Sequence, residues 1–122
     1  MATATLTGID IGSTSVRAVQ TNRGKGQPVV VNFGQAPIPF GAVHGGIIND
    51  EKIVTTALRS LWSEHKFRKR EVVVGVTSHQ IVVREMSLPN LPAKEFRQAL
   101  PFQVRDLLPM PLDKALLDFY PI

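Results

Sequence analysis

The residue types best suited to chemistry gather near the start of the chain, in residues 8–17, which read GIDIGSTSVR. Asp10 lies at the end of an apolar, β-branched run, and a turn of small residues follows. Backbone N–H groups in such a turn can approach a polyphosphate closely, because no bulky side chain intervenes and glycine tolerates positive φ. A carboxylate beside the turn can hold Mg²⁺ directly or through its waters, since Mg²⁺ prefers oxygen ligands. The segment therefore predicts a phosphate-binding turn with a magnesium ligand.

This segment differs from the other common phosphate-binding motifs. A P-loop connects a strand to a helix and carries a lysine, whereas here the turn leads into a second strand. A purely structural interpretation also stays open, in which Asp10 only caps a Gly/Ser-rich turn and Arg17 is a solvent-facing strand residue. The candidate phosphate-binding residues are Asp10, Gly12, Ser13, Thr14 and Ser15, with Asp10 as the metal ligand.

Three strands are expected to position this turn. Residues 5–11 and 16–21 are β-branched and partly alternating, so they predict a hairpin around the turn. Residues 28–33 predict a third antiparallel strand, in which Val29, Val30 and Val31 suit burial on both faces or a central place in a sheet. The prolines and glycines of residues 37–46 predict a loop without regular structure until about Ile47.

The rest of the chain alternates helical and β-rich patterns. Asn49 is the expected N-cap of an amphipathic helix that ends near Phe67. Residues 71–76 and 80–86 predict two further strands. A second helix is expected to present Phe96, Leu100, Val104, Leu107 and Leu108 on one face, with a kink or break at residues 97–100 because Pro101 removes a backbone hydrogen bond. Residues 115–120 predict a last strand.

Composition narrows the function classes. The chain has 122 residues, a net charge of +4 and no cysteine, which suits one compact unit or a piece of a larger one and excludes thiol chemistry. The densest positive charges, Lys66 and residues 68–70, fall where a helix should end, and nothing indicates a stacking platform, so no nucleic-acid partner is expected. There is no long apolar run, and residues 1–6 lack the features of a signal peptide, so we expect a cytoplasmic protein.

The turn resembles the first phosphate-binding motif of the superfamily of actin, sugar kinases and heat-shock chaperones. Later segments look like the PilM family of type IV pilus assembly proteins: GIIND at 46–50, Lys69-Arg70 before a valine-rich strand, VVREMSLP at 82–89, and DLLPMPLDK at 106–114 leading into LDFY at 117–120. The resemblance runs from about Gly8 to Ile122. The last two segments distinguish it from sugar kinases and chaperones.

This resemblance implies an α/β fold with a mixed sheet and helices, of the actin-like or ribonuclease H-like ATPase kind. Residues 1–76 would form the first actin-like subdomain. Residues 77–122 would start the small inserted α+β subdomain that is shared with the cell-division protein FtsA. The second actin-like half would be absent, so these residues alone are expected to bind nucleotide weakly.

The resemblance also implies a function. Asp10, Gly12, Ser13, Thr14, Ser15 and Arg17 would contact ATP phosphates and Mg²⁺. The protein would be a cytoplasmic scaffold with weak or no ATPase activity that docks the N-terminal peptide of a PilN-like membrane protein. It would meet the membrane only through partners, and self-association is left open. The alternatives are an FtsA-like filament-forming division protein and the N-terminal fragment of a sugar or acid kinase.

Overall fold

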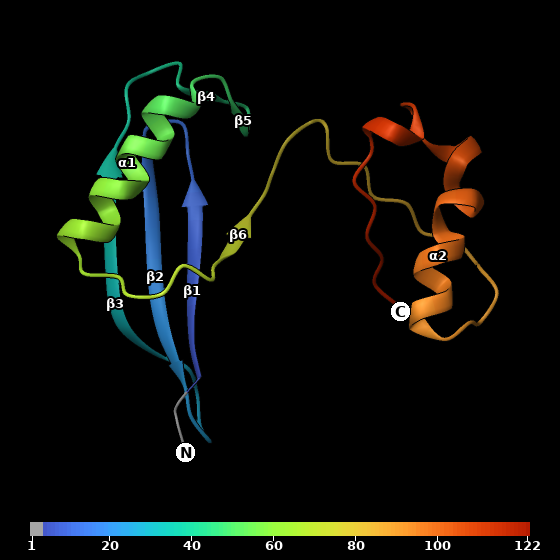
Figure 1. Ribbon diagram of the computed structural model, residues 1–122, viewed down its shortest axis with the longest axis horizontal. Coiled ribbons are helices and arrows are strands. Elements are labelled where there is room, and N and C mark those ends of the chain that lie inside the picture. The colour runs from blue at the N-terminus through green and yellow to red at the C-terminus, as the bar shows by residue number, and fades with distance from the viewer. Residues whose placement is uncertain (1–3) are drawn as a thin grey trace. The chain divides into compact units, whose positions relative to one another are not determined.

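The computed structural model describes residues 4–122 and divides by its internal contacts into two compact units, Met1–Val82 and Val83–Ile122 (Figure 1). Residues 1–3 of the first expected subdomain lie outside the described part. Both units contain helix and the first contains a mixed sheet, so the expected α/β class is confirmed. Within residues 4–122, no helix combines the length and the apolar character that crossing a membrane requires.

The sheet of the first unit has the order β3-β2-β1-β6. Strands β1 (Ala4–Ile11), β2 (Ser15–Arg23) and β3 (Val29–Pro37) form the expected antiparallel meander. Strand β6 (Val73–Gly75) pairs in parallel with β1, which makes the sheet mixed. Because β1 and β6 are parallel, the turn after β1 and the chain after β6 both leave the sheet where the carboxyl ends of these strands lie.

Strand β3 lies at the edge of this sheet rather than at its centre. Val29, Val30 and Val31 are 61%, 58% and 48% exposed. The expectation that these valines are buried on both faces is therefore wrong. Three consecutive valines indicate a strand, but burial depends on which neighbours the fold provides, and an edge strand has a partner on one side only.

A short hairpin interrupts the loop that the sequence predicts at residues 37–46. Strands β4 (Val43–His44) and β5 (Ile47–Ile48) pair around Gly45 and Gly46, whose φ angles are 57° and 78°. Two successive positive φ angles are the requirement of a type I′ turn, which glycine meets without strain. A Cβ at Gly46 would also collide with the backbone carbonyl of Thr77. The loop is therefore more ordered than its composition indicates.

Helix α1 (Glu51–Glu64) follows at once and starts one residue later than expected. Asp50, not Asn49, is the N-cap, and its Oδ1 accepts a 3.0 Å hydrogen bond from the Ile53 N–H. The Asn49 side chain instead donates to the Gly41 carbonyl. Both residue types cap helices well, so only the backbone path decides between them.

The carboxyl end of α1 is closed by a Schellman motif. Lys66 takes the left-handed conformation at φ 55°, the Phe67 N–H donates to the Trp62 carbonyl, and the Lys66 N–H donates to the Ser63 carbonyl. The Phe67 ring then packs on Trp62 with 4.9 Å between ring centroids. The basic residues 66 and 68–70 thus follow the helix end, as expected, but the motif already satisfies these last carbonyls.

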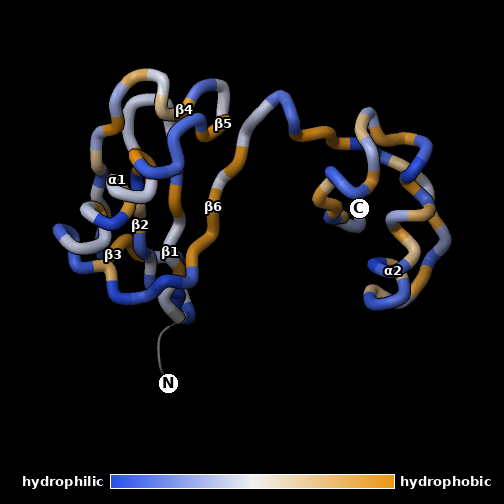
Figure 2. The backbone as a smooth tube through the Cα atoms, turned by 45° about the horizontal axis from the view of Figure 1, so that its top comes forward, coloured by the Kyte–Doolittle hydropathy of each residue, from blue (hydrophilic) through white to orange (hydrophobic). Residues whose placement is uncertain are grey.

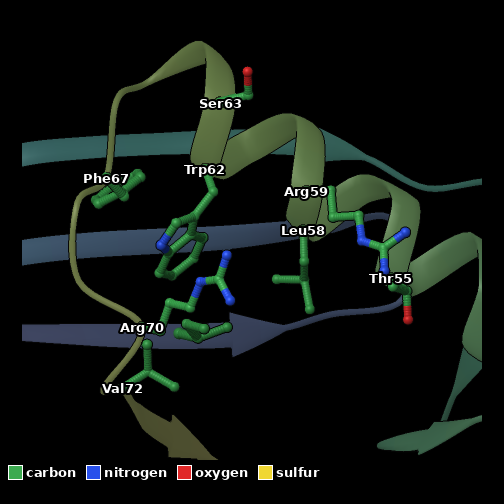
Figure 3. A pocket seen from close by; sticks show the side chains of 9 residues that line it. Thr55, Leu58, Arg59, Trp62, Ser63, Phe67, Arg70 and Val72 are labelled. Carbon is green, nitrogen blue, oxygen red and sulfur yellow. The ribbon is translucent and has the colours of Figure 1, made fainter.

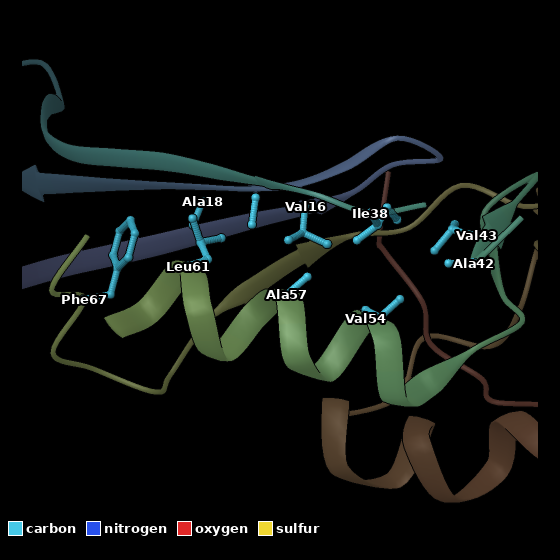
Figure 4. Close-up of a cluster of buried hydrophobic side chains, with 10 residues drawn as sticks. Val16, Ala18, Ile38, Ala42, Val43, Val54, Ala57, Leu61 and Phe67 are labelled. Carbon is cyan, nitrogen blue, oxygen red and sulfur yellow. The ribbon is translucent and has the colours of Figure 1, made fainter. Parts of the chain in front are cut away.

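The core of the first unit lies between α1 and one face of the sheet. Figure 4 shows Val54, Ala57 and Leu61 of α1 facing Val16 and Ala18 of β2. Val16 and Leu61 are fully buried. The buried members of this cluster are Val16, Ala18, Ala36, Ile38, Ala42, Val43, Val54, Ala57, Leu61 and Phe67. On β1 and β2, the residues that alternate with this set project from the opposite face of the sheet, and they include Asp10 and Arg17.

The second unit contains helix α2 (Ala93–Val104) and the 3-10 turns η1 (Arg105–Leu107) and η2 (Leu112–Lys114). Leu100 and Val104 are buried, as expected, whereas Leu107 is 54% exposed. Helix α2 continues through Pro101, so no break occurs there.

Two strands that the sequence predicts are not formed. Residues 80–86 and 115–120 are neither helix nor strand. Phe119 packs its ring on Phe96 of α2, at 4.4 Å between centroids, instead of joining a sheet. A strand needs a neighbour for its backbone groups, and in the described chain these segments have none.

Candidate functional site

The candidate site is the hairpin turn between β1 and β2, at the carboxyl end of β1. The register pairs Ile11 with Val16, and the Gly12 N–H donates a 3.0 Å hydrogen bond to the Ser15 carbonyl, which closes the turn. The Thr14 carbonyl accepts a 2.9 Å hydrogen bond from the Ile38 N–H. The turn is therefore fixed both within its own hairpin and to the chain that leaves β3.

Gly12 is required here for a reason other than the expected one. Its φ is not positive, in contrast to Gly45 and Gly46. A Cβ at this position would lie 3.2 Å from the Ser15 carbonyl oxygen and 3.9 Å from Oδ2 of Asp10. The glycine thus keeps the tight turn and the space beside the carboxylate open, because a larger residue would crowd both.

The tip of the turn presents unused donors. Within residues 4–122, the backbone N–H groups of Ser13 and Thr14 donate no hydrogen bond to backbone or side chain. Both side chains are exposed, and Ser15 is half-buried. Successive free N–H groups in a turn form a concave anion-binding arrangement, and hydroxyl groups add further donors. This donor set suits phosphate oxygens.

Asp10 and Arg17 face each other across the hairpin. They are register partners, and Nη1 of Arg17 lies 3.8 Å from Oδ2 of Asp10, with side chains 58% and 62% exposed for Arg17 and Asp10. An exposed pair at this distance contributes at most about 1 kcal/mol, so it does not hold either group in place. No turn N–H in the described chain donates to Asp10. Both charged groups are therefore free to reach a ligand at the turn.

A shallow hollow of about 470 Å³ lies beside this pair on the sheet face opposite α1. Parallel pairing places Gly75 of β6 next to Asp10, and Gly8 lies two residues before it. Because glycine has no side chain, these two positions leave the hollow open. Its lining residues are Gly8, Ile9, Asp10, Arg17, Val19, Val73 and Gly75.

A second hollow, of about 620 Å³, lies on the α1 side of the sheet and is separate from the hairpin (Figure 3). Trp62 and Leu58 project into it from α1, and Arg59 and Arg70 flank it. Nε1 of Trp62 donates a 2.8 Å hydrogen bond to the Lys69 carbonyl, which ties the chain after α1 to the helix. No pattern in the sequence predicted this hollow.

The six candidate residues thus lie together in one hairpin, and their chemistry fits Mg²⁺ with a polyphosphate. Within residues 4–122 there is no cluster of three or more His, Cys, Asp or Glu residues that could hold a metal by itself. A metal ion at the hairpin would therefore depend on Asp10, on water and on phosphate oxygens, which is the usual arrangement for Mg²⁺ with a nucleotide.

The chain is similar in structure to a chain of the "PilM-PilN type IV pilus biogenesis complex", with a TM-score of 0.73 and 23% identity over 88% of its residues. It spans about a third, 32%, of that chain. This likeness confirms the fold. A family model described as "Type IV pilus assembly protein PilM" matches residues 8–122. The chain therefore belongs to the PilM family of type IV pilus assembly proteins, as its segments after Gly46 indicate.

Proposed function

We propose that this chain is part of a scaffold for type IV pilus assembly that binds ATP with Mg²⁺ at the β1–β2 hairpin. The match to the PilM family over residues 8–122 supports the role in pilus assembly. The free N–H groups at the turn, with Asp10 exposed beside them, support the nucleotide site. The same match leaves the FtsA-like and sugar kinase alternatives without support of their own.

Each residue of the hairpin has a defined part in this proposal. Asp10 holds Mg²⁺ through an oxygen or a bound water, while the N–H groups of Ser13 and Thr14 donate to phosphate oxygens. Arg17 neutralises phosphate charge from the neighbouring strand. Mg²⁺ would supply the charge that draws the phosphate oxygens together. Asp10 is the one carboxylate among these residues and is assigned to Mg²⁺, which leaves no second base to activate water, so we propose a nucleotide-dependent scaffold with weak or no ATPase activity.

Titration of the ¹⁵N-labelled chain with Mg·ATP tests the site directly, because NMR detects weak binding. The amide signals of residues 12–15 should move. Asp10→Asn should weaken binding about tenfold, since losing a contact to a charged group costs about 1.5 kcal/mol or more. Without Mg²⁺, the Asp10→Asn protein should bind ATP at least as tightly as the original, because it lacks a carboxylate that repels the phosphates, whereas Arg17→Gln should be weaker under both conditions.

Asp113→Asn is the matched control, because Asp113 is an exposed aspartate of the second unit. It should leave the affinity for Mg·ATP unchanged. Equal affinity in the Asp10 and Asp113 variants would contradict the role of Asp10, and signal changes confined to residues outside the hairpin would place the nucleotide elsewhere.

We further propose that a PilN-like membrane protein is the partner of this protein. Its N-terminal peptide would dock on the protein in the cytoplasm. The support is the similar solved structure, which is described as a complex of PilM with PilN. Fluorescence anisotropy with a labelled N-terminal peptide of the PilN-like protein should detect saturable binding. A scrambled peptide of the same composition should not bind, and equal signals from the two peptides would exclude specific docking.

A further inference from the structure

The positive charge of this protein is concentrated in one part of the fold. Nine of its 14 basic residues and five of its ten acidic residues lie in Met1–Val82, so this unit carries the entire net charge of +4. Six of these nine cations lie in two short exposed stretches, and we call them the basic end: Arg23, Lys25, Lys66, Arg68, Lys69 and Arg70. The second unit has as many acids as bases and is neutral.

Both stretches lie toward the end of the sheet where β1 begins, away from the nucleotide hairpin. Arg23 pairs with Ala4, so the turn after β2 lies where β1 begins. Residues 65–72 run from the end of α1 to the start of β6, which is parallel to β1. Because Val73 pairs with Gly8, this segment reaches the sheet level with the middle of β1, and Figure 2 shows it as a hydrophilic stretch between α1 and β6. The hairpin of residues 12–15 lies at the opposite edge of β1.

Exposed apolar side chains accompany these cations. Val29 and Val30 follow the turn that carries Lys25, and they are 61% and 58% exposed. Phe67, the aromatic residue between Lys66 and Arg68, is buried against Trp62, so it offers no base-stacking platform. Cations beside shallow apolar side chains are complementary to a phospholipid surface, where phosphates lie above the acyl region. Nucleic acid would use the cations but not the valines.

We propose that the basic end binds the surface of an anionic phospholipid bilayer. The protein would thus contribute to membrane attachment by itself, beyond any attachment through partners, and this contribution is independent of the nucleotide site. Each basic residue near an anionic surface increases partitioning about fivefold, and the effect falls off within about 10 Å at 0.1 M salt. Four clustered residues are enough for a measurable effect.

Co-sedimentation of the 122-residue chain with vesicles tests this proposal. Binding should be detected with phosphatidylcholine vesicles that contain phosphatidylglycerol, should be weak with phosphatidylcholine alone, and should fall as salt is raised. Exchange of Lys66, Arg68, Lys69 and Arg70 for glutamine should reduce partitioning at least about tenfold, because four contributions are removed together. Replacing Arg68 and Arg70 by lysine should preserve binding, since the interaction depends on charge.

The matched control removes the same charge from the neutral unit by exchanging Arg84, Lys94, Arg105 and Lys114 for glutamine. It should change partitioning less than about twofold, since these residues lie outside the basic end. All eight side chains are exposed, so circular dichroism should give the same melting temperature for both variants and the original. Equal loss in the two variants, equal binding to both kinds of vesicle, or no binding at all would overturn the proposal. Tighter binding to a duplex DNA or RNA oligonucleotide than to anionic vesicles, in the same buffer, would overturn it in favour of nucleic acid.

Discussion

Gly34 is a residue whose role depends on a single close contact. It lies on β3 where α1 ends, and a Cβ built there would lie 2.5 Å from the ring atoms Cγ and Cδ2 of His65. The neighbouring Asn32 donates a 2.8 Å hydrogen bond to the His65 carbonyl, so this part of the chain is held from two sides. The packing of α1 on the sheet therefore has no room for a side chain at this position.

Replacing Gly34 by alanine should destabilise the protein by about 1–3 kcal/mol, because the added methyl group overpacks a fixed contact. Urea unfolding measures the change. Gly8→Ala is the control in the same sheet, since the nearest atom to its Cβ, the Val19 carbonyl oxygen, is 4.0 Å away. We expect Gly8→Ala to be neutral or slightly stabilising. Combining Gly34→Ala with His65→Ala should recover part of the loss, and purely additive effects would exclude this contact as the cause.

The residues of the β1–β2 hairpin also divide into those that close packing explains and those that it does not. Asp10 and Arg17 are more than half exposed and form only a loose pair, so their identities are not explained by stability. Gly12 is explained by close approach to Ser15. Exposed charged residues beside free N–H groups thus indicate a ligand site. Gly12 and Gly34, in contrast, mark positions where neighbouring atoms leave no room for a side chain.

At the scale of the elements, the start of α1 distinguishes two candidate caps. Asp50→Ala should cost about 1 kcal/mol, because it removes the acceptor of the Ile53 N–H. Asn49→Ala should cost less, since it removes only an exposed hydrogen bond to the Gly41 carbonyl. Thermal unfolding of both variants gives the comparison. A larger loss from Asn49→Ala would mean that the helix begins one residue earlier than described.

The end of α1 offers a stabilising change. Lys66 takes a left-handed φ of 55°, which costs a residue with a Cβ about 1 kcal/mol and costs glycine nothing. Lys66→Gly should therefore raise the free energy of unfolding by about 0.5–1 kcal/mol. Lys69→Gly, in the same exposed loop without a positive φ, should not. A loss of stability in Lys66→Gly would contradict the Schellman geometry.

At the scale of the whole molecule, the division into two units predicts where a protease acts. Residues 76–92 contain neither helix nor strand, and Arg84 is the one trypsin site within them. Cleavage requires a long stretch of backbone free of secondary structure, and the shorter stretch of residues 66–72 is held by the buried Phe67 and by the hydrogen bond from Trp62 to the Lys69 carbonyl. Trypsin should therefore cut first after Arg84 and release residues 1–84 and 85–122. Mass spectrometry of early time points identifies the fragments. Arg84→Gln should remove this first cut, and an earlier cut after Arg17 would show that the sheet is less stable than the segment.

The sequence by itself determined the local features of this protein. The hairpin around residues 12–15, helix α1 and the family followed from residue types over short spans, because turns, helix periodicity and motifs depend on neighbours in the chain. Tertiary structure alone decided that β3 is an edge strand, that β6 pairs in parallel with β1, and that residues 80–86 and 115–120 form no strand. The physical reason is that a strand forms only when its backbone groups make hydrogen bonds to another segment. β-branched residues therefore favour a strand, but a partner distant in the sequence decides whether it forms.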